Sequence, residues 1–133
     1  SGVNAGFSTA PKEKLYIKQD ESADRPTVEG QQADKDSLYH EIKKLIVVRQ
    51  AHKALQSKGE IEFVYAEKES YPFAYVRSME DEKILVVINP SDKEVSFKSG
   101  LQLGEVIYSY NGEAKAQDDI ITVPAGSASF VRV

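Results

Sequence analysis

The most informative stretch of this sequence is the run Ile84-Leu85-Val86-Val87-Ile88, in which five apolar residues follow one another. A strand with one solvated face alternates apolar and polar residues, whereas this run places apolar side chains on both faces. We therefore expect a central strand that is covered on each side. The turn residues Asn89-Pro90-Ser91-Asp92 follow directly and end the strand.

Other short runs rich in β-branched and aromatic residues surround this stretch. Turn sequences separate them, among them Glu80-Asp81-Glu82, Asn111-Gly112 and Pro124-Ala125-Gly126. This spacing predicts a mainly β fold, an antiparallel Greek-key β-sandwich. Its strands, about seven in number, are expected at residues 61–65, 73–77, 84–88, 95–97, 106–110, 120–123 and 127–133.

A single long helix is predicted over residues 36–58, with Asp34, Asp36 and Ser37 as candidate caps and Gly59 placed to end it. At roughly 100° per residue, its apolar sector covers about 200°. A helix that packs on one neighbour needs a stripe of only a little over 100°. The helix is therefore expected to be held from two sides. The sector contains Leu38, Tyr39, Ile42, Leu45, Ile46, Val48, Arg49, His52 and Leu55.

The first 35 residues are polar, contain Pro11 and Pro26, and show no sustained apolar period. They are predicted to form an irregular connection. Because such a long structureless segment is unusual inside a compact domain, we expect it to belong to something larger. Ser1-Gly2 is typical of a cloning scar, so the sequence is interpreted as a piece of a longer protein.

Composition excludes several functions. The chain has 17 basic and 21 acidic residues, a formal net charge of -4, and no cysteine. The negative charge argues against nucleic acid as a partner, and the lack of cysteine excludes disulfides, thiol nucleophiles and cysteine zinc sites. No apolar run is long enough to span a membrane. These features favour a cytoplasmic protein with no membrane partner.

The sequence offers no catalytic constellation. His40 and His52 are the only histidines, and twelve helical residues would separate them by about 18 Å, so they cannot share a metal ion within one chain. No Gly-x-Ser-x-Gly elbow occurs, and the acidic pairs lie in polar turns where their pKa values would not separate. We predict no catalytic residue, no metal ligand and no cofactor.

Two residues of the helix are instead assigned structural roles. Arg49 lies in the middle of the apolar sector and needs a carboxylate or several carbonyls there, which would tie the helix to a neighbour. His52 is expected to pack partly at the end of the helix, where the helix dipole favours it.

The aromatic residues leave two interpretations open. Rings on strands can stack on sugars, or they can form cross-strand pairs and core, and the lack of tryptophan favours the second. The first would make the chain an autonomous carbohydrate-binding module that takes an α-glucan or oligosaccharide. The rings in question are Tyr65, Tyr71, Phe73, Tyr75, Tyr108 and Tyr110.

Several segments in order resemble one enzyme family. They begin with Asn4-Ala5-Gly6-Phe7-Ser8-Thr9-Ala10 and continue with Asp36-Ser37-Leu38, Leu45-Ile46-Val47-Val48-Arg49 and His52-Lys53-Ala54-Leu55. Leu85-Val86-Val87-Ile88-Asn89 and Pro124-Ala125-Gly126-Ser127-Ala128 complete the series. Together they resemble family 13 glycoside hydrolases, the α-amylase family, and in particular α-glucosidases and oligo-1,6-glucosidases.

The resemblance implies a domain organisation. Residues 1–58 would be a remnant of the catalytic barrel, with the loop at 1–35 and the last barrel helix at 36–58, and residues 59–133 would be the all-β C-terminal domain. The family's catalytic carboxylates have no counterpart here, so the chain is expected to be non-catalytic and to pack against its own barrel. The parent would hydrolyse or transfer α-glucosidic bonds, in carbohydrate metabolism.

The resemblance also places Asn4 and Phe7 near the mouth of the barrel, where they would touch substrate in the parent enzyme only. Without the barrel, the helix face around Leu38, Ile42 and Ile46 should fold onto the sheet, stay partly exposed or mediate self-association.

Overall fold

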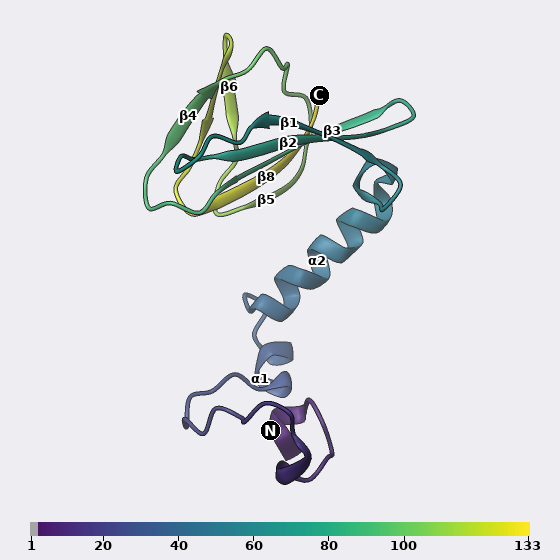
Figure 1. Ribbon diagram of the computed structural model, residues 1–133, viewed down its shortest axis with the longest axis vertical. Coiled ribbons are helices and arrows are strands. Elements are labelled where there is room, and N and C mark those ends of the chain that lie inside the picture. The colour runs from purple at the N-terminus through teal and green to yellow at the C-terminus, as the bar shows by residue number, and fades with distance from the viewer. Residues whose placement is uncertain (1–2) are drawn as a thin grey trace. The chain divides into compact units, whose positions relative to one another are not determined.

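The computed structural model describes residues 3–133. The chain divides into two compact units, Ser1–Ile46 and Val47–Val133, and the boundary falls within one helix, α2 (Leu38–Ala51). The second unit is a sandwich of two antiparallel sheets (Figure 1). This confirms the predicted mainly β fold.

The larger sheet has the strand order β1-β2-β3-β8-β5, and the smaller has the order β4-β7-β6. The chain passes from one sheet to the other between β3 and β4, β4 and β5, β5 and β6, and β7 and β8. Among the described residues there are eight strands, one more than predicted, because the polar strand β6 has no apolar alternation that marks it. The bounds are β1 (Glu60–Tyr65), β2 (Phe73–Met79), β3 (Glu82–Asn89), β4 (Val95–Lys98), β5 (Val106–Tyr110), β6 (Lys115–Gln117), β7 (Ile120–Val123) and β8 (Ser127–Arg132).

Strand β3 lies between β2 and β8 and is buried on both faces, as its sequence predicts. Leu85 and Val87 point into the core between the sheets, where they join Phe97 and Ile121. Ile84 and Val86 point to the opposite face and pack in a second cluster with Ala54 and Leu55, and Val48 lies against that cluster. Full burial of an aliphatic side chain of this size contributes about 1.5–3 kcal/mol. We call these two sides of the larger sheet its inner face and its outer face.

The predicted helix over 36–58 is too long. It ends at Ala51, and a 3-10 turn, η3 (Lys53–Leu55), follows after His52, which has extended backbone angles. The Ala54 amide donates to the Glu82 carboxylate (3.0 Å) and so does not continue the helix. Gly59 does not end the helix. It allows the backbone to pass close to Ala54, because a Cβ at this position would lie 2.2 Å from the Ala54 carbonyl oxygen.

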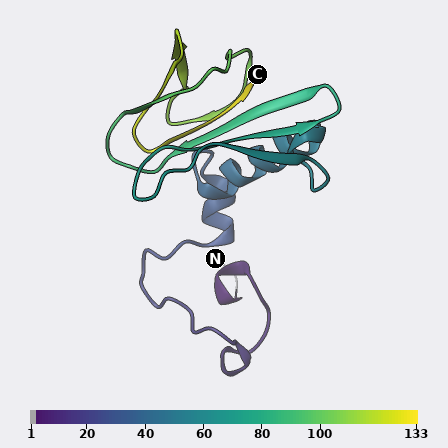
Figure 2. The same ribbon diagram turned by 45° about the horizontal axis from the view of Figure 1, so that its top comes forward.

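Among residues 3–35, three short helical segments occur where an irregular connection was predicted: η1 (Val3–Gly6), η2 (Lys12–Lys14) and α1 (Val28–Ala33). Thr27 caps α1 by accepting a hydrogen bond from the Gly30 amide (3.1 Å). With six residues, α1 is too short to display a helical period in the sequence. Figure 2 shows the long irregular connection between η2 and α1.

Candidate functional site

In the edge strand β1, the apolar residues face away from the smaller sheet and the acidic residues face toward it. This is the reverse of what an isolated sandwich requires. Its sequence alternates, yet Ile61 and Phe63 lie on the outer face, where 52% and 60% of each is exposed, and Glu60 and Glu62 lie on the inner face. The register fixes this assignment, because Phe63 is opposite Tyr75 and Tyr75 is opposite the outer-face residue Val86. Apolar residues therefore occupy the open side of this strand.

The exposed apolar surface continues across the outer face. The Phe73 ring lies between those of Phe63 (centroids 5.8 Å apart) and Tyr75 (5.4 Å), and 39% of Phe73 is exposed. Exposed contiguous apolar surface on a small protein marks an interaction site. We call Ile61, Phe63, Phe73 and Tyr75 the outer apolar patch.

The ring geometry argues against a sugar platform on this patch. A sugar stacks on a flat aromatic surface, but Phe63 and Phe73 are tilted by 46° and Phe73 and Tyr75 by 51°. Two other candidate rings, Tyr65 and Tyr108, pair with Phe97 and Phe130. These contacts are the cross-strand and core pairs expected from the structural interpretation.

His52 lies in a polar junction between the end of α2 and the β2–β3 hairpin. Its Nδ1 is 2.7 Å from Glu82 Oε1, and Glu82 Oε2 accepts the Ala54 amide. Arg132 Nη1 is 3.4 Å from Glu82 Oε1. Burial raises the pKa of Glu82, but the Ala54 amide, the His52 hydrogen bond and the charges of His52 and Arg132 outweigh it, so the net pKa is lowered. Glu82 thus acts as an ionised anchor for the segment after α2.

Arg77 makes more contacts to the segment after α2 than Arg49, the residue for which a structural tie was predicted. Arg49 is exposed, and its Nε donates to one carbonyl, that of Leu55 (3.3 Å). Arg77 on β2 donates to three carbonyls of the segment that leads into β1, and sequence reasoning missed it. Its position on the apolar side of the β2 alternation was the available signal. The acceptors are Gln56 (2.7 Å), Gly59 (2.9 Å) and Glu60 (3.1 Å).

In the first unit, Asn4 and Phe7 differ in their surroundings. Asn4 is buried, with left-handed backbone angles, and its Nδ2 donates to the carbonyls of Ser8 (3.0 Å) and Ala10 (2.7 Å). The side chain of Asn4 therefore fixes the loop. Phe7 is 74% exposed.

Phe7 lines an apolar groove of about 550 Å³ together with α1 and α2. The face of α2 that contributes to this groove is bare, since Leu38 is 69%, Ile42 46% and Ile46 51% exposed. The groove is lined by Phe7, Val28, Gln31, Leu38, Tyr39, Ile42, Lys43 and Ile46.

Across residues 3–133, no three His, Asp or Glu side chains gather in a way that could hold a metal ion. None of the helices in this range has the length and apolarity that crossing a bilayer requires. His40, the other histidine, contacts the Gln32 carbonyl (3.0 Å).

Residues 61–113 match the family model for the C-terminal domain of maltogenic amylase. The chain is also 31% identical, over 106 residues, to Alpha-amylase 3 of Dictyoglomus thermophilum, a match that covers 80% of this chain and 21% of that protein. Residues 61–113 of the β unit therefore have the sequence of an α-amylase-family C-terminal domain. The chain spans about a fifth of the length of this curated relative.

Solved structures share the fold of this C-terminal domain and of the segment before it. The trehalulose synthase MutB from Pseudomonas mesoacidophila MX-45 is 23% identical with a TM-score of 0.76, and the match covers 98% of this chain and 23% of that one. An isomaltulose synthase variant from Erwinia rhapontici NX5 is 21% identical with a TM-score of 0.72, covering 88% and 21%.

Proposed function

We propose that this chain is the non-catalytic C-terminal part of an α-amylase-family enzyme, which packs against the catalytic barrel and stabilises it. Residues 1–58 would belong to the barrel as its last loop and helix, and residues 59–133 form the β domain. The parent enzyme hydrolyses or transfers α-glucosidic bonds. The exposure of Ile61 and Phe63 on the outer apolar patch carries this proposal, because such a surface needs a cover.

Phe63 gives the proposal a magnitude. A Phe side chain buries about 150–250 Å² in a core, and 60% of Phe63 is exposed. Covering that part removes about 120 Å² from water, which contributes about 3 kcal/mol at 25 cal/mol per Å². The barrel would therefore gain stability from this one contact alone.

The test compares Phe63→Lys with Ile120→Lys, which changes a 39% exposed residue on the smaller sheet. Each variant is made in this chain and in the full-length enzyme of the natural gene. We expect Phe63→Lys to lower the Tm of the full-length enzyme by several degrees more than that of this chain, while Ile120→Lys affects the two proteins equally. Equal effects of Phe63→Lys in both proteins would contradict docking on the barrel.

Catalysis is tested directly on this chain. Purified protein should release no glucose from maltose or isomaltose and no nitrophenol from 4-nitrophenyl α-glucopyranoside. Turnover that co-purifies with the chain through successive columns would refute the non-catalytic assignment.

The cysteine-free composition supports a cytoplasmic location, which cell fractionation of the natural host tests.

We also propose that Asn4 and Phe7 shape the substrate entrance of the parent enzyme. Asn4 would do so by fixing the loop through its two hydrogen bonds, and Phe7 by direct contact from its exposed position. Phe7→Ala in the full-length enzyme should raise KM for its α-glucoside with little change in kcat. An unchanged KM would remove Phe7 from the entrance.

Without the barrel, the bare α2 face is proposed to mediate self-association through Leu38, Ile42 and Ile46. Light scattering should then show a mass that rises with concentration above 14.8 kDa, and Ile42→Lys should abolish the rise. A strictly monomeric chain at millimolar concentration would contradict this.

A further inference from the structure

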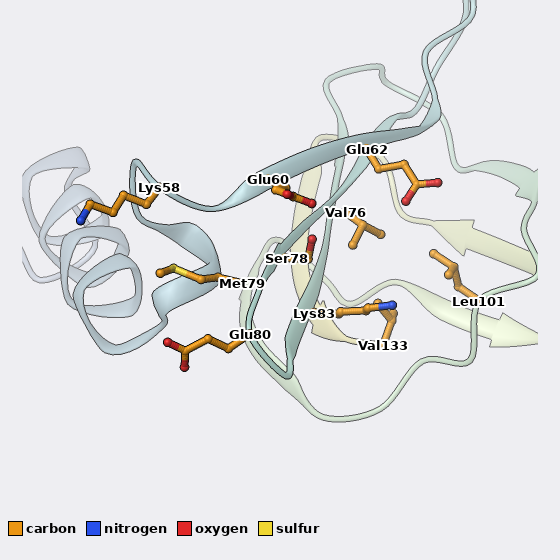
Figure 3. A pocket seen from close by; sticks show the side chains of 10 residues that line it. All are labelled: Lys58, Glu60, Glu62, Val76, Ser78, Met79, Glu80, Lys83, Leu101 and Val133. Carbon is orange, nitrogen blue, oxygen red and sulfur yellow. The ribbon is translucent and has the colours of Figure 1, made fainter.

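A hollow of about 660 Å³ on the inner face of the larger sheet is lined mainly by charged and aliphatic side chains (Figure 3). Its residues Glu60, Glu62 and Lys83 are exposed, and exposed charges of this kind are ordinary protein surface. The hollow therefore indicates no ligand. A reactive group lies instead at the opposite end of the sheet, where β5 ends at Tyr110 and Asn111 follows.

Asparagine is a chemically labile residue, because the backbone nitrogen of the next residue can attack its side-chain carbonyl carbon. The chain has three asparagines. Asn4 and Asn89 are only 6% and 0% exposed, and Asn89 precedes Pro90, whose nitrogen carries no hydrogen to lose. Asn111 is exposed and precedes Gly112, which has no side chain to shield its nitrogen. Asn111 is therefore the reactive asparagine of the three.

The fold itself favours this reactive pair. Asn111 has a φ of 54°, a left-handed angle that asparagine adopts more readily than most residues. Gly112 has a φ of 117°, and a Cβ there would lie 3.0 Å from Pro124 Cγ. A larger residue is disfavoured at this position on both grounds. The bend after β5 therefore keeps the labile dipeptide in place.

The side chain of Asn111 also joins two turns. Its Nδ2 donates to the carbonyls of Ala125 (3.2 Å) and Gly126 (3.3 Å), in the turn between β7 and β8. Both partners are acceptors, so the contact needs a donor at residue 111. An ionised carboxylate only accepts hydrogen bonds, and it would place a negative oxygen against the two carbonyl oxygens. Loss of the amide therefore opens the contact.

We propose that Asn111 is a site of spontaneous deamidation and that its conversion releases the contact between the two turns. The Gly112 nitrogen loses its proton and bonds to Asn111 Cγ, and the Cγ–Nδ2 bond breaks as ammonia leaves. Water then opens the five-membered imide. Cleavage of the bond between the nitrogen and Cγ gives aspartate, and cleavage of the bond to the main-chain carbonyl carbon gives isoaspartate. Overall, one water is consumed and one ammonia is released.

The hydrogen bonds of Asn111 set the pace of this reaction. The side chain can turn toward the Gly112 nitrogen only when its contact with the Ala125 and Gly126 carbonyls opens. Local opening of exposed contacts occurs without unfolding of the domain. The folded chain should therefore convert more slowly than an unstructured peptide of the same sequence. This proposal does not rest on docking to a barrel.

The experiment keeps the folded chain below its Tm at mildly alkaline pH for several weeks and then maps its tryptic peptides by mass spectrometry. We expect the peptide with Asn111 to show the mass change of an amide-to-acid exchange, with at least about tenfold less conversion in the peptides with buried asparagines. Fragment ions distinguish Asn111 from Gln102. A synthetic peptide of residues 106–115 should convert faster than the chain. The tryptic peptides are residues 1–12 with Asn4, 84–93 with Asn89 and 99–115 with Asn111.

Three variants separate the reaction from its consequence. Asn111→Gly accepts a positive φ but has no side-chain carbonyl, so it should stop the mass change in residues 99–115. Asn111→Asp imitates the product, and it should shift the amide signals of Ala125 and Gly126 and lower the Tm by several degrees. Gln102→Glu adds the same charge at another exposed position and should do neither.

Three results would overturn the proposal. The first is an unconverted Asn111 in the folded chain under conditions that convert the synthetic peptide. The second is equal conversion of Asn4 or Asn89. The third is an Asn111→Asp variant with the Tm and the Ala125 and Gly126 amide signals of the wild-type chain, which would refute the release of the contact.

Discussion

Replacing Glu82 by Gln should destabilise the β unit markedly at neutral pH. Glu82 receives hydrogen bonds from two directions, His52 Nδ1 at 2.7 Å and the Ala54 amide at 3.0 Å, and only 19% of its side chain is exposed. A hydrogen bond to a charged group contributes roughly 1 kcal/mol more than a neutral one. Losing the charge at two such bonds costs about 2 kcal/mol.

For a domain of this size, 1 kcal/mol corresponds to about 4–8 °C in Tm. Glu82→Gln should therefore lower the Tm by about 8–16 °C at pH 7, measured by circular dichroism of the sheet. The matched control is Glu80→Gln in the same hairpin. Its partner is Lys53 at 2.8 Å, and both side chains are more than 60% exposed, so solvent screens this ion pair and it contributes little to stability.

The dependence on pH sharpens this test. The lowered pKa of Glu82 means that its ionised form is favoured by folding, so its contribution is complete above its ordinary pKa of 4.5. It is lost as the pH falls through the lowered folded-state value. The Tm difference between the wild-type chain and Glu82→Gln should thus be full at pH 7 and shrink below about pH 4.5. A difference that persists unchanged at pH 3, or an equal loss in Glu80→Gln, would refute the reasoning.

Two further changes test the packing of the β unit. Gly59→Ala places a Cβ 2.2 Å from the Ala54 carbonyl oxygen, so urea denaturation should show a loss of roughly 1–3 kcal/mol, and an unchanged midpoint would contradict the close approach. Asn89 is fully buried, and its Nδ2 donates to the Lys93 (2.7 Å) and Pro124 (2.8 Å) carbonyls. Asn89→Ala should therefore cost about 2–4 kcal/mol in the same assay, since it leaves buried carbonyls unpaired. A loss below 1 kcal/mol would show that water replaces the amide.

The central strand was predictable because its information is local. Ile84-Leu85-Val86-Val87-Ile88 needs cover on both sides wherever it lies, and the structure supplies that cover from the smaller sheet and from the segment after α2. The end of α2 was not predictable in this way. The helix does not continue through Ala54 because the Ala54 amide donates a hydrogen bond to Glu82, which lies 28 residues further along the chain.

The candidate site shows a second limit of sequence reasoning. The alternation in Glu60-Ile61-Glu62-Phe63 establishes that the two sides of β1 differ, but not which side meets the smaller sheet. The ordinary assumption places Ile61 and Phe63 in the core, and pairing with β2 places them outside. The sugar-stacking alternative could not be assessed from spacing either, because it depends on ring tilts.

In each unit, some apolar residues are exposed although their spacing in the sequence predicts that they are buried. In the first unit these are Leu38, Ile42 and Ile46 of α2, and in the second they are Ile61 and Phe63 of β1. The two surfaces lie on different elements. The apolar residues of α2 follow a helical period, and those of β1 alternate with acidic residues. Sugar stacking does not account for either exposed surface. The α2 groove is lined mainly by aliphatic side chains, and the rings of the outer apolar patch are tilted against one another. A protein body that contacts both units would cover both surfaces, and this is the role that we propose for the catalytic barrel of the parent enzyme.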